Sequence, residues 1–165
     1  KVEVPEGMTA RQWLANHYFK HFSEQYQTDL ASFCTHSEIM DSILYSLFPN
    51  FAPWAGFHPN LTYRMKPYGD NHEMCTMEII VLMRFPEGQE RPADCQVHKL
   101  DKDQLFSEAP GLEGGLGRVF DQDFTNLKML QKGMKNLQSK EVVLANYQEV
   151  RIRHFHQTLD KYINA

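Results

Sequence analysis

Residues 116–137 read LGRVFDQDFTNLKMLQKGMKNL, and large apolar side chains recur in this stretch every three or four residues. Such spacing places them on one face of an α-helix that packs against the rest of the fold. One acid, Asp123, interrupts this face, whereas Asp121 is expected on the water-facing side. The apolar positions are Leu116, Val119, Phe120, Phe124, Leu127, Leu130, Met134 and Leu137.

A carboxylate on a buried face costs on the order of several kcal/mol unless a cation or a hydrogen-bond donor meets it. We therefore predict that Asp123 is buried and has a partner. The pattern leaves three roles open for this side chain: a metal ligand, a general base, or an acceptor for a neighbouring backbone group.

The composition is that of an ordinary globular chain. It has 165 residues, of which 42% are hydrophobic and 23% charged, and its formal net charge is -4. We expect one domain over residues 1–165. No basic cluster points to nucleic acid or a membrane surface, and no apolar run is long enough to span a bilayer. We expect a cytoplasmic protein, and the opening KVEVPEGM suggests a piece of a longer one.

The first half of the chain predicts two helices followed by strands. Thr9 and Gln12 have the spacing of a capping box at the start of a helix, and a short helix is expected over residues 38–42. Residues 43–54 are aromatic and β-prone, which predicts one strand kinked at Pro49. Alternation over residues 61–66 and 74–85, with a turn at 67–71, predicts an antiparallel pair.

The second half predicts fewer strands and more helix. A last short strand is expected over residues 96–100, followed by an irregular connector that ends at Gly117. Beyond Gln138 a second amphipathic pattern places Tyr147, Val150 and Tyr162 on an inward face. The fold class is therefore α+β, an antiparallel sheet with long helices packed across it.

Several common sites are missing from the sequence. It contains no GxSxG, P-loop or GxGxxG motif, which weakens hydrolase and nucleotide-binding interpretations. His17 and His21 lie one helical turn apart, a spacing that suits a metal, but two half-buried histidines are the more common reason for it. The three cysteines are widely spaced and do not form a zinc motif.

Several segments, taken in order, resemble the catalytic large (alpha) subunit of Rieske non-haem iron ring-hydroxylating oxygenases. The resemblance extends from about Pro5 onward, so the chain is similar to the C-terminal part of that catalytic domain. It implies a helix-grip (START/SRPBCC-like) fold, here incomplete, with the sheet around a long C-terminal helix. The segments are LFPNFAPW, NLTYRMKPYGDN, MEIIVLMRFPEG, VFDQDFTNLKMLQKGM and NYQEVRIRHFHQTLDKYI.

The resemblance implies roles for named residues. Asp123 begins a D-x-x-N-[LM] pattern and would be one of three ligands of a mononuclear Fe(II), with Asn126 or Gln131 orienting it. The substrate-binding residues would be Phe48, Asn50, Phe120 and Phe124. The two histidine ligands of the family, and the cysteines and histidines of its [2Fe-2S] Rieske cluster, match no positions in this chain.

The same resemblance implies the reaction and the partners. The whole protein would hydroxylate an aromatic or similar apolar substrate with O2, taking electrons from a ferredoxin or reductase through the Rieske cluster. It would be a homo-oligomer, a trimer with or without a small subunit, and this fragment alone would be inactive. The alternative is a helix-grip module that binds a hydrophobic small molecule without redox chemistry.

Overall fold

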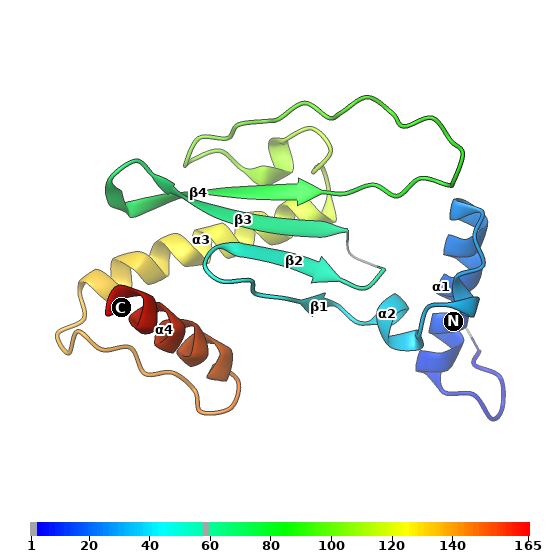
Figure 1. Ribbon diagram of the computed structural model, residues 1–165, viewed down its shortest axis with the longest axis horizontal. Coiled ribbons are helices and arrows are strands. Elements are labelled where there is room, and N and C mark those ends of the chain that lie inside the picture. Colours follow the sequence, from blue (N-terminus) through cyan, green and yellow to red (C-terminus); the bar gives the residue numbers. More distant parts are fainter. Residues whose placement is uncertain (1–2, 58–59) are drawn as a thin grey trace. The chain divides into compact units, whose positions relative to one another are not determined.

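The computed structural model describes residues 3–57 and 60–165 and confirms the α+β class (Figure 1). The chain forms two compact units, Lys1–Arg91 and Pro92–Ala165, which we call the sheet unit and the helical unit. Within the described ranges, no helix is both long and apolar enough to cross a membrane.

The sheet unit begins with two helices, and each of them starts at a capping box. Helix α1 (Ala10–Tyr26) starts at a capping box in which Gln12 N donates to Thr9 Oγ1 at 3.2 Å and Thr9 N donates to Gln12 Oε1 at 2.9 Å, as predicted. Helix α2 (His36–Met40) has a second box, formed by Thr35 and Glu38. It starts earlier than the predicted residue 38 because the side chain of Thr35 accepts a hydrogen bond from Glu38 N and so caps the first turn.

The core of the sheet unit lies where these helices meet the end of strand β2 (Phe51–Ala55). Leu30 belongs to the short 3-10 helix η1 (Leu30–Ser32), which follows α1. Aromatic and aliphatic side chains distant in sequence are buried together here, so the helical layer and the sheet share one hydrophobic cluster. Its buried members are Ala15, Phe19, Leu30, Ile39 and Phe57.

The sheet is antiparallel, with the order β1-β2-β3-β4 (Figure 1). Its strands are β1 (Ile43–Leu44), β2 (Phe51–Ala55), β3 (Leu61–Tyr68) and β4 (Asn71–Val81). The predicted antiparallel pair of β3 and β4 is confirmed, but its second strand spans residues 71–81 instead of 74–85. Tyr68 pairs with Asn71 across a turn in which Gly69 has a φ of +54°. Glycine tolerates that left-handed conformation without strain.

Two strand predictions are wrong. Residues 43–54 form two antiparallel strands, with Ile43 opposite Ala55, instead of one kinked strand. The chain reverses at residues 48–50, where Pro49 has no N–H for a sheet ladder. The predicted strand at 96–100 is irregular, and Val97 is 85% exposed, so it has no apolar surface against which to form.

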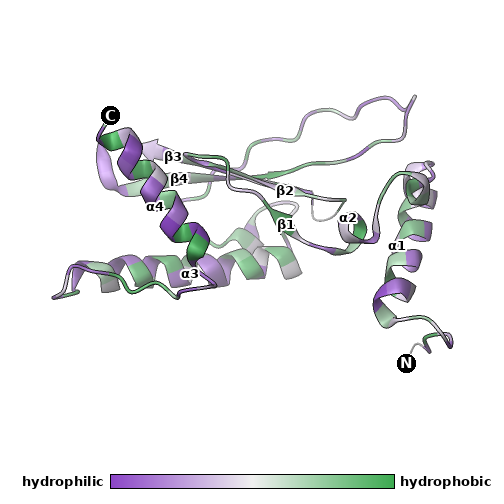
Figure 2. Cartoon of the chain, turned by 60° about the horizontal axis from the view of Figure 1, so that its bottom comes forward, coloured by the Kyte–Doolittle hydropathy of each residue, from purple (hydrophilic) through white to green (hydrophobic). Residues whose placement is uncertain are grey.

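The helical unit contains the 3-10 helix η2 (Phe106–Glu108), α3 (Gly115–Lys135) and α4 (Val150–Ile163). Phe106 packs on the first turns of α3, with its ring centroid 5.7 Å from that of Phe120 and 4.5 Å from that of Phe124. The predicted inward face of the last helix is not buried, because no residue of α4 is buried and Tyr162 is exposed. Figure 2 shows apolar segments along both helices.

Candidate functional site

Helix α3 has two apolar faces where the sequence suggests one. Gly117, Phe120 and Phe124 turn towards η2, and the first two are buried. A second face remains exposed. The eight apolar positions cover a wider arc of the helix than one neighbouring segment can bury, so the single predicted face is divided into a covered face and an exposed face. The large exposed side chains of the second face are Leu116, Val119, Leu127, Leu130 and Met134.

Asp123 lies at the centre of this exposed apolar face. Its neighbours one turn away in either direction, Val119 and Leu127, are 51% and 54% exposed. The prediction that Asp123 is buried is wrong, because η2 covers a different side of the helix. Among residues 3–57 and 60–165, its carboxylate has no hydrogen bond or ion pair. It is therefore an uncommitted anion surrounded by apolar side chains.

Asp121 has the environment that was predicted for Asp123. Its side chain is half-buried and accepts a hydrogen bond from Phe106 N at 2.5 Å. The prediction that it faces water is therefore wrong. The sequence spacing indicates this environment, since Asp121 comes four residues after Gly117 and one turn before Phe124 and therefore shares their side of the helix. This hydrogen bond joins η2 to α3, so the carboxylate of Asp121 has a structural role.

The two amides named beside Asp123 lie at different distances from it. Asn126 is exposed and three residues further along α3, so the two side chains are neighbours on the helix surface. Gln131 is eight residues further on, about 12 Å along the axis at the usual helical rise. Of the two amides, only Asn126 lies on the turn next to Asp123.

Phe120 and Phe124 pack beside η2. Phe120 is buried and Phe124 half-buried, and both rings contact Phe106. On the helix they turn away from the centre of the Asp123 face, so their packing with η2 fixes the orientation of that face.

Phe48 and Asn50 lie in the sheet unit, in the turn between β1 and β2. Both are half-buried. Asn50 Nδ2 donates to Met65 O at 2.7 Å, and Met65 N donates to Asn50 O at 2.9 Å. The side chain of Asn50 thereby extends the ladder between β2 and β3 into the turn.

The histidines of α1 take part in aromatic packing. The ring of His17 stacks on Trp13, with centroids 5.5 Å apart and planes 3° apart, and His21 lies against Phe22. Across the part of the chain that the structure describes, no three His, Cys, Asp or Glu side chains gather as metal ligands would.

Comparison with known families found one match. The family described as "Ring hydroxylating alpha subunit (catalytic domain)" matches residues 5–165, a range that includes every candidate site residue. Searches of curated proteins and of solved structures found no match.

Proposed function

Because the chain belongs to the ring hydroxylating alpha subunit family, through its catalytic domain, we propose that it is the C-terminal portion of a non-haem Fe(II) oxygenase. The whole enzyme would hydroxylate an aromatic or similar apolar substrate with O2. Residues 1–165 would supply the aspartate ligand of the iron and part of the substrate pocket.

The observation that carries this proposal is the uncommitted carboxylate of Asp123 on an apolar face of α3. Covering that face with the rest of the protein would remove the acid from water, and a buried carboxylate needs a compensating cation. An anionic oxygen ligand suits Fe(II), particularly beside two imidazoles. Asn126, one turn away, would orient the carboxylate through a hydrogen bond, and Gln131 would act from farther along the helix.

The cofactors follow from the family. Fe(II), when bound, supplies the activation of O2, and a [2Fe-2S] Rieske cluster elsewhere in the protein would supply electrons from a ferredoxin or reductase. The two histidine ligands would also lie outside residues 1–165. We further propose a trimer, with or without a small subunit.

We propose substrate-binding roles for two residues of the helical unit and, separately, for two residues of the sheet unit. Phe120 and Phe124 would support substrate binding below Asp123, and Phe48 would contact substrate from the sheet unit. Asn50 would contribute there through its backbone turn, since its side chain already bonds Met65 O at 2.7 Å.

The test is made in the protein with its upstream part present. Asp123→Ala should lose bound iron and hydroxylation together, because one of three ligands is gone. Asp121→Asn is the matched control: the acid is two residues away and its replacement keeps an oxygen for Phe106 N, so iron should remain. Metal content is measured by atomic emission. Full iron content in Asp123→Ala would exclude the ligand role.

The alternative function, a module that binds a hydrophobic molecule without redox chemistry, uses the same apolar face of α3. It predicts that an apolar ligand binds Asp123→Ala as tightly as the original protein and that neither protein contains iron. Iron content of the unsubstituted protein therefore separates the two functions.

A further inference from the structure

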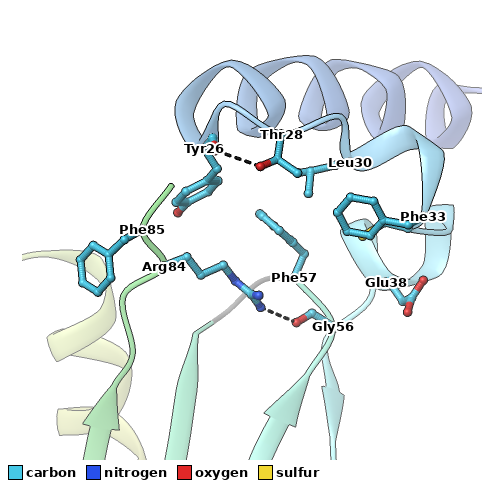
Figure 3. A pocket seen from close by; sticks show the side chains of 10 residues that line it. Tyr26, Thr28, Leu30, Phe33, Glu38, Gly56, Phe57, Arg84 and Phe85 are labelled. Carbon is cyan, nitrogen blue, oxygen red and sulfur yellow. Dashed lines mark hydrogen bonds between the residues drawn. The ribbon is translucent and has the colours of Figure 1, made fainter. Parts of the chain in front are cut away.

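The sheet unit contains a cavity of about 620 Å³, between the end of α1, the loop around η1 and the segment after β4 (Figure 3). This volume is within the range of sites that bind small organic molecules. The cavity lies wholly within the sheet unit and includes none of the residues proposed above for iron or substrate. The lining residues that matter here are Tyr26, Phe33, Cys34, Phe57 and Arg84.

Arg84 brings a positive charge to this cavity. Its guanidinium donates to Gly56 O at 3.1 Å and to Asn60 Oδ1 at 3.4 Å, and its Cζ lies 4.4 Å from the ring centroid of Phe57. Both acceptors are neutral oxygens. Within the described ranges, no carboxylate forms an ion pair with Arg84.

The acid in the lining, Glu38, is engaged elsewhere. Its Oε2 accepts hydrogen bonds from Thr35 N at 2.7 Å and Thr35 Oγ1 at 2.9 Å, as part of the cap of α2. Figure 3 shows its carboxylate on the far side of the cavity from Arg84. The guanidinium therefore has donor capacity and charge left for an incoming anion.

The aromatic wall beside Arg84 is held in place before any ligand arrives. Phe57 is 8% exposed, its N donates to Glu38 O at 2.6 Å, and its ring meets Tyr26 edge-on with centroids 5.6 Å apart. Gly56, with a φ of +88°, allows this contact, because a Cβ there would lie 2.8 Å from Glu38 O. A wall that is already ordered loses little entropy on binding.

We propose that this cavity binds a small aromatic carboxylate, whose anionic group pairs with Arg84 and whose ring packs against Tyr26 and Phe57. Guanidinium pairs well with planar carboxylates, and an aromatic wall favours a flat apolar body. The binding is non-covalent and needs no metal. It stands apart from the proposed oxygenase function, so either can fail without the other.

The half-buried thiol of Cys34 offers a readout inside the cavity. Burial raises the pKa of Cys34, the nearby Glu38 raises it further and Arg84 opposes them. A ligand beside Arg84 would cover this thiol and slow its alkylation. Cys75 and Cys95 are exposed elsewhere on the chain and serve as internal controls.

The experiment titrates the 165-residue chain with 2-naphthoate, with its neutral counterpart 2-naphthalenemethanol, and with acetate, by calorimetry. We expect saturable binding of 2-naphthoate, at least about tenfold weaker binding of the alcohol and of acetate, and slower alkylation of Cys34 only. Arg84→Gln should weaken 2-naphthoate binding by at least about tenfold, since it removes a charge-assisted pair.

The matched control is Arg64→Gln, which removes an arginine already paired with Glu78 on the sheet and should leave affinity unchanged. Arg84→Lys keeps the charge but not the two-pronged donor set, so its affinity should fall between those of the original and Arg84→Gln, even if glutamine disturbs the fold. Equal affinity of Arg84→Gln, Arg84→Lys and the original chain overturns the proposal. Binding that leaves Cys34 equally reactive, or an absence of saturable binding, also overturns it.

Discussion

Two acids two residues apart on α3 have different surroundings, because successive side chains on a helix are rotated by about 100° about its axis. Asp121 points to η2 and accepts a hydrogen bond from Phe106 N at 2.5 Å. Asp123 points to the other side of the helix, where it is exposed among apolar side chains and Asn126. The structural acid and the candidate ligand are therefore distinct residues, which makes their separate substitution informative.

Gly117 sets how closely η2 approaches α3. A Cβ at this position would lie 2.2 Å from Leu112 O and 2.7 Å from Ser107 Cα, both backbone atoms that cannot move independently. We expect Gly117→Ala to destabilise the helical unit by about 1–3 kcal/mol, because the connector must shift away from the helix. Denaturant unfolding followed by circular dichroism measures the change.

Gly133 in the same helix is the matched control, since nothing lies within 4 Å of a Cβ built there. Gly133→Ala should stabilise α3 by about 0.5–1 kcal/mol through helix propensity alone. Opposite signs for the two substitutions support the close approach at Gly117, and a stabilising Gly117→Ala would contradict it.

Among the secondary-structure elements, α1 and α2 are joined by an exposed ion pair. Arg11 donates to the Asp41 carboxylate at 2.7 Å, and Ser37 also donates to that carboxylate. Arg11 first, and then Ser37, lower the pKa of Asp41 from 3.8 to about 2. Asp41 follows the last turn of α2, so its ionisation is coupled to the docking of the two helices.

This coupling predicts a loss of stability in acid. A pKa that is lower in the folded state means that folding favours the ionised form, so the contribution is complete above about pH 4 and disappears as pH falls towards 2. Asp41→Asn should lower stability at pH 6 and flatten its decline between pH 4 and 2. Denaturant midpoints across this range provide the measurement.

Asp70→Asn, in the turn between β3 and β4, is a suitable comparison because the carboxylate of Asp70 pairs with no described residue. Its profile should follow that of the original chain. High salt should reduce the contribution of Asp41, as for any exposed ion pair. If Asp41→Asn keeps the full acid decline, the ion pair does not control it.

The whole molecule exposes many large apolar side chains. On α3 alone, Val119, Leu127, Leu130 and Met134 are each at least half exposed. Contiguous apolar surface of this kind usually marks a place where other protein or a ligand packs. The proposed function assigns the covering of this face to the rest of the oxygenase.

We predict that the chain alone binds the dye ANS through this face. The double substitution Leu127→Gln and Leu130→Gln should reduce ANS fluorescence at least about twofold, because it interrupts the contiguous patch. Helicity should change little, since glutamine is a good helix former. Fluorescence titration and circular dichroism on the same samples measure both properties.

Val143→Gln is the control for this prediction, because Val143 is 95% exposed but lies in an irregular segment outside the α3 face. It should leave dye binding unchanged. If the double variant binds as much ANS as the original chain, the exposed face of α3 is not the dominant apolar surface.

The sequence by itself determined the elements whose signals are local. The capping box of Thr9 and Gln12 marked the start of α1, the period of residues 116–137 marked α3, and alternation with a short turn marked the β3–β4 hairpin. These patterns depend on hydrogen bonds and side chains a few residues apart, so they can be read without knowing the rest of the fold. The D-x-x-N motif at Asp123 also belongs to this local information.

Only the tertiary structure decided which face of each element is covered. The turn at residues 48–50 divided one predicted strand into β1 and β2, and the packing of η2 on α3 half-buried Asp121 instead of Asp123. The cavity beside Arg84 likewise combines α1, the η1 loop, α2 and the segments after β2 and β4. Burial depends on which distant segment arrives at a surface, and periodicity within one element carries no information about that segment.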